Sequence, residues 1–148
     1  MFCVLQLTSL EPTFTPSPSA EAWQMSTAPM MLIAAHKTSL DIFKEVGFKK
    51  LLAKSKDLSA YLFYVLEQIN NPKKFDILTP TNAEERGCQV SISVNENAKA
   101  IFDELIKKGI FADWREPNVI RVAAVPLYNT FEDIFYFANV LQELFQKK

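Results

Sequence analysis

The chain contains very little glycine, with three glycines among 148 residues, whereas the average protein has roughly 7%. Gly47 and Gly109 follow segments with helical periodicity, where a left-handed residue is favoured after the last turn. Gly87 lies in a predicted turn before a strand. No glycine-rich loop remains that could hold a phosphate with its backbone N–H groups. The sequence therefore excludes P-loop proteins and proteins with a dinucleotide-binding fingerprint.

Histidine and cysteine are also rare, with one histidine and two cysteines. Cys3 and Cys88 lie far apart in the sequence, so neither belongs to a paired metal-binding or redox motif. His36 lies within a predicted helix, and we interpret it as a packed or surface residue rather than as a catalytic base. We therefore expect no metal site, and the cysteine usage predicts a reduced, cytoplasmic setting.

Arginine is limited to three positions, and the formal net charge is −1. Without a basic stripe there is no electrostatic reason to expect binding of nucleic acid or of an anionic membrane. The apolar segment Met1–Leu7 is too short to cross a membrane and lacks the basic region of a signal peptide. With 49% apolar and 22% charged residues, the composition is that of a globular protein.

The spacing of apolar residues predicts a small α+β domain that follows an irregular arm. Residues 1–28 hold three of the eight prolines among serines and threonines, which is typical of an irregular segment. We expect residues 29–148 to form one domain in which helices flank a small, mostly antiparallel sheet. The predicted elements are a helix to residue 46, a helix over 48–70, strands over 75–79 and 88–94, a helix ending at Gly109, strands over 110–114 and 119–125, and a final helix.

Two predicted helices carry possible capping residues at their first turn. Asn95 or Asn97 can cap the helix that ends at Gly109. Asn129 can cap the final helix, and Glu132 stands three residues later, as a capping box requires.

Arg121 is the most informative candidate for a functional residue, because it lies within the apolar run of the predicted strand 119–125. A guanidinium stays charged at any working pH, so a buried one needs an anionic partner. Its planar donors match a carboxylate in two-point geometry. The residues alone leave two interpretations open: an internal salt bridge with Asp113 or Glu84, or a bond to the carboxylate of a ligand.

The other candidates have simpler structural interpretations. Glu84 and Glu85 precede Arg86 in a predicted turn, which indicates a solvated turn more than a pair of catalytic carboxylates. Trp23 and Trp114 could each stack on a flat ligand, but core packing is the preferred interpretation. Cys88 in a half-buried strand is expected to act as a small apolar residue.

Three blocks of the sequence resemble the C-terminal part of kynureninases. They are Trp23–Pro29 (WQMSTAP), Glu84–Gln89 (EERGCQ) and Asp113–Asn129 (DWREPNVIRVAAVPLYN). The resemblance runs from about residue 14 to the C-terminus and does not include residues 1–13. It implies the C-terminal domain of an aspartate-aminotransferase-like, pyridoxal-phosphate-dependent enzyme that acts as a homodimer.

The resemblance also implies an activity and a set of site residues. Kynureninases cleave the Cβ–Cγ bond of L-kynurenine or 3-hydroxykynurenine hydrolytically, giving an anthranilate and alanine, in tryptophan catabolism and NAD biosynthesis. Arg121 stands at the position of the family arginine that binds the substrate α-carboxylate, which favours the ligand interpretation. Thr27 stands where the family has a substrate-contacting asparagine, and Trp23 and Ser26 are expected near the site.

The resemblance places no catalytic residue and no cofactor anchor in this chain, because the lysine that forms the Schiff base belongs to the large domain of the family. We therefore expect residues 1–148 alone to be inactive and to require a large domain or a homodimer partner. Two alternatives stay open: a non-catalytic binding or interaction module derived from this domain, and a fragment of another enzyme of the same cofactor superfamily. A ligand-binding Arg121 should be partly exposed and without a tight two-point partner among the acids Asp113, Glu84, Glu85 and Glu116, whereas a structural one should be deeply buried against one of these acids.

Overall fold

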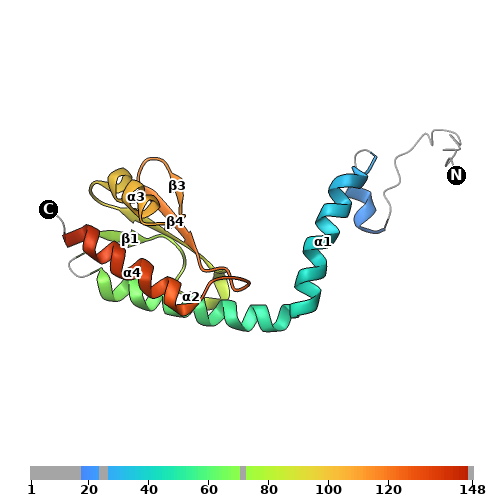
Figure 1. The fold of residues 1–148 in the computed structure, drawn as a ribbon, viewed down its shortest axis with the longest axis horizontal. Coiled ribbons are helices and arrows are strands. Elements are labelled where there is room, and N and C mark those ends of the chain that lie inside the picture. The colour runs from blue at the N-terminus through green and yellow to red at the C-terminus, as the bar shows by residue number, and fades with distance from the viewer. Residues whose placement is uncertain (1–17, 24–26, 71–72, 147–148) are drawn as a thin grey trace, which may run out of the picture. The chain divides into compact units, whose positions relative to one another are not determined.

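The strands form one four-stranded antiparallel sheet with the order β1-β2-β4-β3 (Figure 1). The computed structural model describes residues 18–23, 27–70 and 73–146. The strands are β1 (Phe75–Ile77), β2 (Gln89–Val94), β3 (Asp113–Arg115) and β4 (Val119–Ala123). The predicted α+β class with a mostly antiparallel sheet is confirmed.

The two faces of the sheet differ because side chains alternate along each strand. In β2, Val90, Ile92 and Val94 are almost completely buried. Val90 lies opposite Val122 and Ile92 opposite Ile120 on the neighbouring strand β4. The intervening residues of β2 are polar and less buried. One face of the sheet therefore belongs to the core, and the other carries polar side chains.

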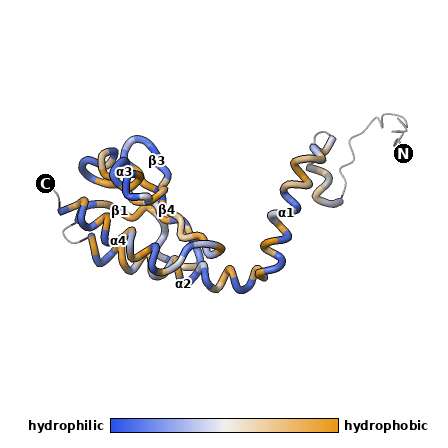
Figure 2. The backbone as a smooth tube through the Cα atoms, viewed as in Figure 1, coloured by the Kyte–Doolittle hydropathy of each residue, from blue (hydrophilic) through white to orange (hydrophobic). Residues whose placement is uncertain are grey.

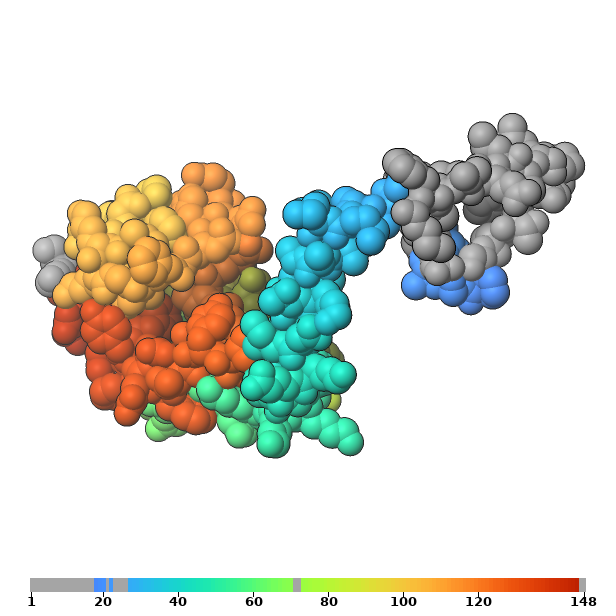
Figure 3. Space-filling view, turned by 45° about the vertical axis from the view of Figure 1, so that its right-hand side comes forward, coloured from blue at the N-terminus to red at the C-terminus, as the bar shows by residue number. Residues whose placement is uncertain are grey.

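Three helices supply the rest of the core. They are α2 (Phe48–Ile69), α3 (Ala98–Lys107) and α4 (Phe131–Gln146). α4 packs against both α2 and α3, and Figure 3 shows α3 and α4 beside each other on the surface. Their buried residues recur at helical spacing, so each helix presents one apolar stripe to the core. The largest fully buried side chains of sheet and helices are those of Leu58, Leu62, Leu66, Phe75, Val90, Ile92, Val94, Leu105, Ile120 and Leu141.

The chain divides into two compact units, Met1–Ile42 and Phe43–Lys148. The sheet and the helices α2, α3 and α4 belong to the second unit. The first unit contains the short 3-10 helix η1 (Ala20–Trp23) and most of α1 (Met30–Val46). α1 has no buried residue, and Figure 2 shows hydrophobic and hydrophilic positions alternating along it. The large apolar side chains exposed on α1 are those of Met30, Met31, Leu32, Ile33, Leu40, Ile42, Phe43 and Val46.

Several predicted boundaries need correction. The strand predicted over 110–114 lies instead at Asp113–Arg115. Ile110 and Ala112 still contact the core, but as partly buried residues outside the sheet. The strands predicted to end at residues 79 and 125 end at Ile77 and Ala123.

The predicted caps of α3 and α4 also differ from the observed ones. Asn97 precedes α3 in a left-handed conformation, with φ of 54°, and its side chain makes no capping hydrogen bond. At α4 the capping box is shifted by one residue. The backbone N–H of Asp133 donates to Thr130 Oγ1 (3.2 Å), and the backbone N–H of Thr130 donates to Asp133 Oδ2 (2.8 Å). Asn129 Oδ1 instead accepts from the backbone N–H of Val125 (2.9 Å).

Candidate functional site

Arg121 lies on the polar face of the sheet, between residues of two neighbouring strands. It is opposite Ser91 of β2 on one side and opposite Asp113 of β3 on the other. Its neighbour Ile120 is completely buried on the opposite face. The strand alternation therefore directs Arg121 away from the core, although the surrounding sequence is apolar.

The guanidinium of Arg121 binds Asp113 through one of its two donor edges. Arg121 Nε donates to Asp113 Oδ2 at 2.6 Å, and Arg121 Nη2 donates to the same oxygen. Among the described residues, Nη1 makes no hydrogen bond. The side chain of Arg121 is 30% exposed and that of Asp113 is 49% exposed. Arg121 therefore has an internal acidic partner and also an edge that a second carboxylate could contact.

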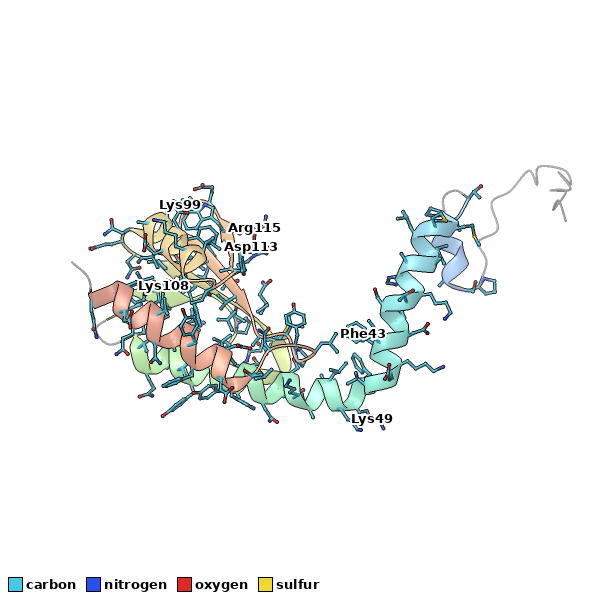
Figure 4. The ribbon with its side chains drawn as sticks, viewed as in Figure 1. Phe43, Lys49, Lys99, Lys108, Asp113 and Arg115 are labelled. Atoms are coloured by element: carbon cyan, nitrogen blue, oxygen red, sulfur yellow. The ribbon has the colours of Figure 1, made fainter. Side chains whose placement is uncertain are left out.

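Asp113 lies between two arginines. Arg115 Nε donates to the same Oδ2 atom at 3.1 Å, and Figure 4 shows Asp113 and Arg115 side by side on β3. The hydrogen bond from Arg121 is the main reason that the pKa of Asp113 is lowered, and the charge of Arg115 acts in the same direction. These three residues together carry two positive charges and one negative charge.

Arg121 matches neither limiting case of the sequence analysis. It is partly exposed, as a ligand-binding arginine should be, but it is paired with Asp113. The other acid considered, Glu84, forms an ion pair with Lys56 at 3.0 Å. No local sequence pattern indicates Ser91 as a neighbour of Arg121, because only the register between β2 and β4 brings the two residues together.

The predicted site residues near the N-terminus lie in the first unit. Thr27 is exposed. Trp23 ends the 3-10 helix η1, and Ser26 lies outside the described residues. Their contribution to a site with Arg121 stays a prediction.

The remaining candidate residues, Trp114, His36 and Cys88, lie where a structural or surface role is expected. Trp114 is half-buried, its ring centroid is 5.6 Å from that of Phe102, and its Nε1 donates to Glu116 Oε1 at 2.9 Å. His36 is exposed on α1, and Cys88 is partly buried. These positions agree with the structural interpretations preferred from the sequence.

Arg86 connects the turn before β2 to helix α2. Its guanidinium carbon lies 3.7 Å from the ring centroid of Phe63, and its Nε donates to Ser59 Oγ at 3.2 Å. The buried Ser59 hydroxyl in turn donates to the Gly87 carbonyl oxygen at 3.2 Å. The polar atoms of this contact are thus paired, and Arg86 holds the turn before β2 against α2.

An open cavity of about 370 Å³ lies beside the end of β4 and the start of α4. Phe111, Tyr128 and Tyr136 provide aromatic side chains, and Ala123 and Asn129 lie at its wall. Arg121 does not line this cavity. Its aromatic lining therefore forms a concavity that does not include the Arg121–Asp113 pair.

The polar face fits a carboxylate better than it fits a covalently held cofactor. The four strands contain arginine, serine and aspartate but no lysine, so they offer no amine for a Schiff base. Among the residues the structure describes, no cluster of three or more histidine, cysteine or acidic side chains could hold a metal ion. The described helices include none that is both long and apolar enough to span a bilayer.

Comparison with known families identifies the domain. Residues 51–141 match the Kynureninase C-terminal domain family. The kynureninase of Flavobacterium psychrophilum is 46% identical over 136 residues, which are 90% of this chain and 32% of the relative. The kynureninase of Xanthomonas euvesicatoria pv. vesicatoria is 39% identical over the same shares of the two chains. The chain thus spans about a third of the length of these curated relatives.

Solved structures show the same fold at low sequence identity. A NifS-like protein has a TM-score of 0.56 and 20% identity, over 66% of this chain and 29% of its own. A C-DES mutant with glycine covalently linked to its PLP cofactor has a TM-score of 0.54 and 21% identity, over 64% of this chain and 24% of its own. The predicted likeness to the C-terminal domains of pyridoxal-phosphate enzymes is therefore confirmed for the fold.

Proposed function

Because the chain belongs to the family of kynureninase C-terminal domains, we propose that it forms the substrate-carboxylate side of a kynureninase active site. Arg121 binds the α-carboxylate of the amino-acid substrate. The observation that carries this proposal is the partly exposed guanidinium on the polar face of the sheet, with one donor edge unoccupied among the described residues. A charged, two-point contact of this kind is strong and directional.

The proposed reaction is the hydrolytic cleavage of the Cβ–Cγ bond of L-kynurenine or 3-hydroxykynurenine, which releases an anthranilate and alanine. Pyridoxal phosphate supplies the electron sink for such chemistry when it is bound. The part of this chain is to bind and orient: a fixed α-carboxylate sets the direction of the bonds at Cα. Thr27, Trp23 and Ser26 are proposed to lie near the same substrate.

The cofactor anchor and the remaining walls of the site are proposed to come from a large domain and from the second subunit of a homodimer. Exposed apolar side chains on α1, such as Leu40 and Phe43, support a partner surface there. Residues 29–148 would form the small domain and residues 1–28 an arm. A cytoplasmic location and a role in tryptophan catabolism and NAD biosynthesis follow from the same proposal.

Complementation tests this function. The chain would be mixed with the two-thirds of the Flavobacterium psychrophilum kynureninase that it does not match, together with pyridoxal phosphate and L-kynurenine. Release of anthranilate, followed by its fluorescence, should require both polypeptides. The matched third of the relative, supplied in place of this chain, is the positive control.

Two variants make the assay specific for the proposed site. Arg121→Met should lower kcat/KM by about a hundredfold, because charged hydrogen bonds to the substrate are lost. Lys107→Met removes an exposed cation of α3 that pairs with Glu104 outside this cluster, and it should change kcat/KM by less than about threefold. An unchanged rate for Arg121→Met would contradict the role of Arg121. Turnover with the third of the relative but not with this chain would contradict the proposed function.

A further inference from the structure

We propose that Asp113 is a positioning residue that fixes the guanidinium of Arg121 for a ligand carboxylate. This inference rests on the proposed function of Arg121. The observation behind it is the choice of edge: Asp113 Oδ2 accepts from Nε and Nη2.

A guanidinium has two edges that can each meet a carboxylate. One consists of Nε and Nη2, and the other of Nη1 and Nη2. Asp113 accepts from Nε and Nη2 along the first edge, whereas Nη1 of the second edge makes no hydrogen bond among the described residues. An acid that occupied the ligand's own edge of the guanidinium would have to be displaced before the ligand could bind. Asp113 can remain in place, so Asp113 and a ligand can bind Arg121 together.

The pairing of β3 with β4 places Asp113 beside Arg121. Asp113 and Arg121 are direct partners in the β3–β4 ladder. Arg115, two residues along β3 and on the same face, donates from Nε to Asp113 Oδ2 at 3.1 Å. The carboxylate is thus supported from its own strand while it supports Arg121 on the next, and a side chain oriented in this way loses less freedom when a ligand binds.

The charges agree with simultaneous binding. Arg121 and Arg115 contribute two positive charges and Asp113 one negative charge, so the cluster keeps an attraction for an anion. The side chain of Arg121 is 30% exposed, so part of it can be reached from solvent.

Two substitutions separate positioning from electrostatics. Asp113→Asn and Asp113→Ala both remove the negative charge, but only asparagine keeps a carbonyl oxygen that can accept from Arg121. Acetate is the probe and acetamide its uncharged control, and binding to the whole chain is followed by 15N–1H NMR of the arginine Nε–H groups. The chain has three arginines, so Arg→Lys variants assign the signals.

Positioning predicts that Asp113→Ala binds acetate about tenfold more weakly than Asp113→Asn, as expected for the loss of a hydrogen bond to a charged group. Equal affinities of the two variants would overturn the inference. In the parent chain, the Arg121 Nε–H signal should stay protected from solvent exchange when acetate saturates. Loss of that protection on saturation would show that Asp113 is a displaced competitor, which also overturns it.

The signal of Arg121 decides the inference even without acetate binding. If acetate does not perturb Arg121 in the parent chain, the proposed carboxylate-binding function fails. Protection of the Nε–H that persists in Asp113→Asn and is lost in Asp113→Ala would still support positioning by Asp113. Unchanged protection in Asp113→Ala, with an unchanged backbone spectrum, would overturn it.

Discussion

Adjacent residues of β4 should respond very differently to substitution, because they lie on opposite faces of the sheet. Ile120 is completely buried in the core, whereas Arg121 lies on the polar face with 30% of its side chain exposed. Replacing Ile120 by alanine removes buried methyl groups and leaves a cavity. Replacing Arg121 by methionine removes a partly solvated ion pair and keeps most of the aliphatic stem.

The expected magnitudes follow from these surroundings. A buried Ile→Ala substitution costs about 2–5 kcal/mol of unfolding free energy. An ion pair exposed to water contributes about 0–1 kcal/mol, so Arg121→Met should stay within about 1 kcal/mol of the parent. Ile120→Val, at about 0.5–1.5 kcal/mol, is the milder variant if Ile120→Ala does not fold.

Urea denaturation followed by circular dichroism measures these differences in one series. A loss of about 3–5 kcal/mol for Arg121→Met would refute the reasoning, because that is the cost of breaking a deeply buried ion pair. Arg121 would then be a structural residue, and its role in binding a carboxylate would lose its basis.

Three further predictions concern caps, titration and packing. Thr130→Ala should lower the free energy of unfolding, measured in urea, by about 1 kcal/mol, because Thr130 caps α4. The control Glu132→Ala, at an exposed position, should change it by less than about 0.5 kcal/mol. Equal losses in the two variants would contradict the observed capping box. The pKa of Asp113 is lowered mainly by Arg121, so its stabilising contribution is complete above the usual value of about 3.9 and is lost as the pH falls through the lower folded value. A 13C titration should show the Asp113 midpoint rising in Arg121→Met, and an unmoved midpoint would show that the pair does not form in solution. Arg86→Lys should cost about 1 kcal/mol in a thermal melt, because lysine cannot reproduce the planar contact with the aromatic ring beneath it; full stability would show that this contact contributes nothing.

The sequence alone predicted those elements whose pattern is local. The helix expected over 48–70 is observed at Phe48–Ile69, because its apolar residues recur at the spacing of one helical face. The strand expected over 88–94 is observed at Gln89–Val94, because apolar and polar residues alternate there. Both patterns depend only on the geometry of a few consecutive residues.

Features that depend on pairing between distant segments were predicted less well. The segment 110–114 looked like a strand because it is apolar, but only Asp113–Arg115 pairs with β4. Ile110 and Ala112 contribute to the core from outside the sheet. Asn129 was expected to cap α4, but the capping residue is Thr130, one position later. Asn129 Oδ1 accepts a hydrogen bond from the backbone N–H of Val125 instead.

At the candidate site, too, the local sequence pointed to the residue, whereas pairing between distant strands decided its neighbours. An arginine within an apolar run marked Arg121 as unusual from the sequence alone, because a guanidinium cannot be buried without an anionic partner. The sequence offered Asp113 and Glu84 equally as that partner. Only the register of β3 against β4 brings Asp113 to Arg121, and only the register of β2 places Ser91 on the other side. Register is fixed by which residues of each strand enter the core, so the surroundings of Arg121 were decided by packing between segments far apart in the chain.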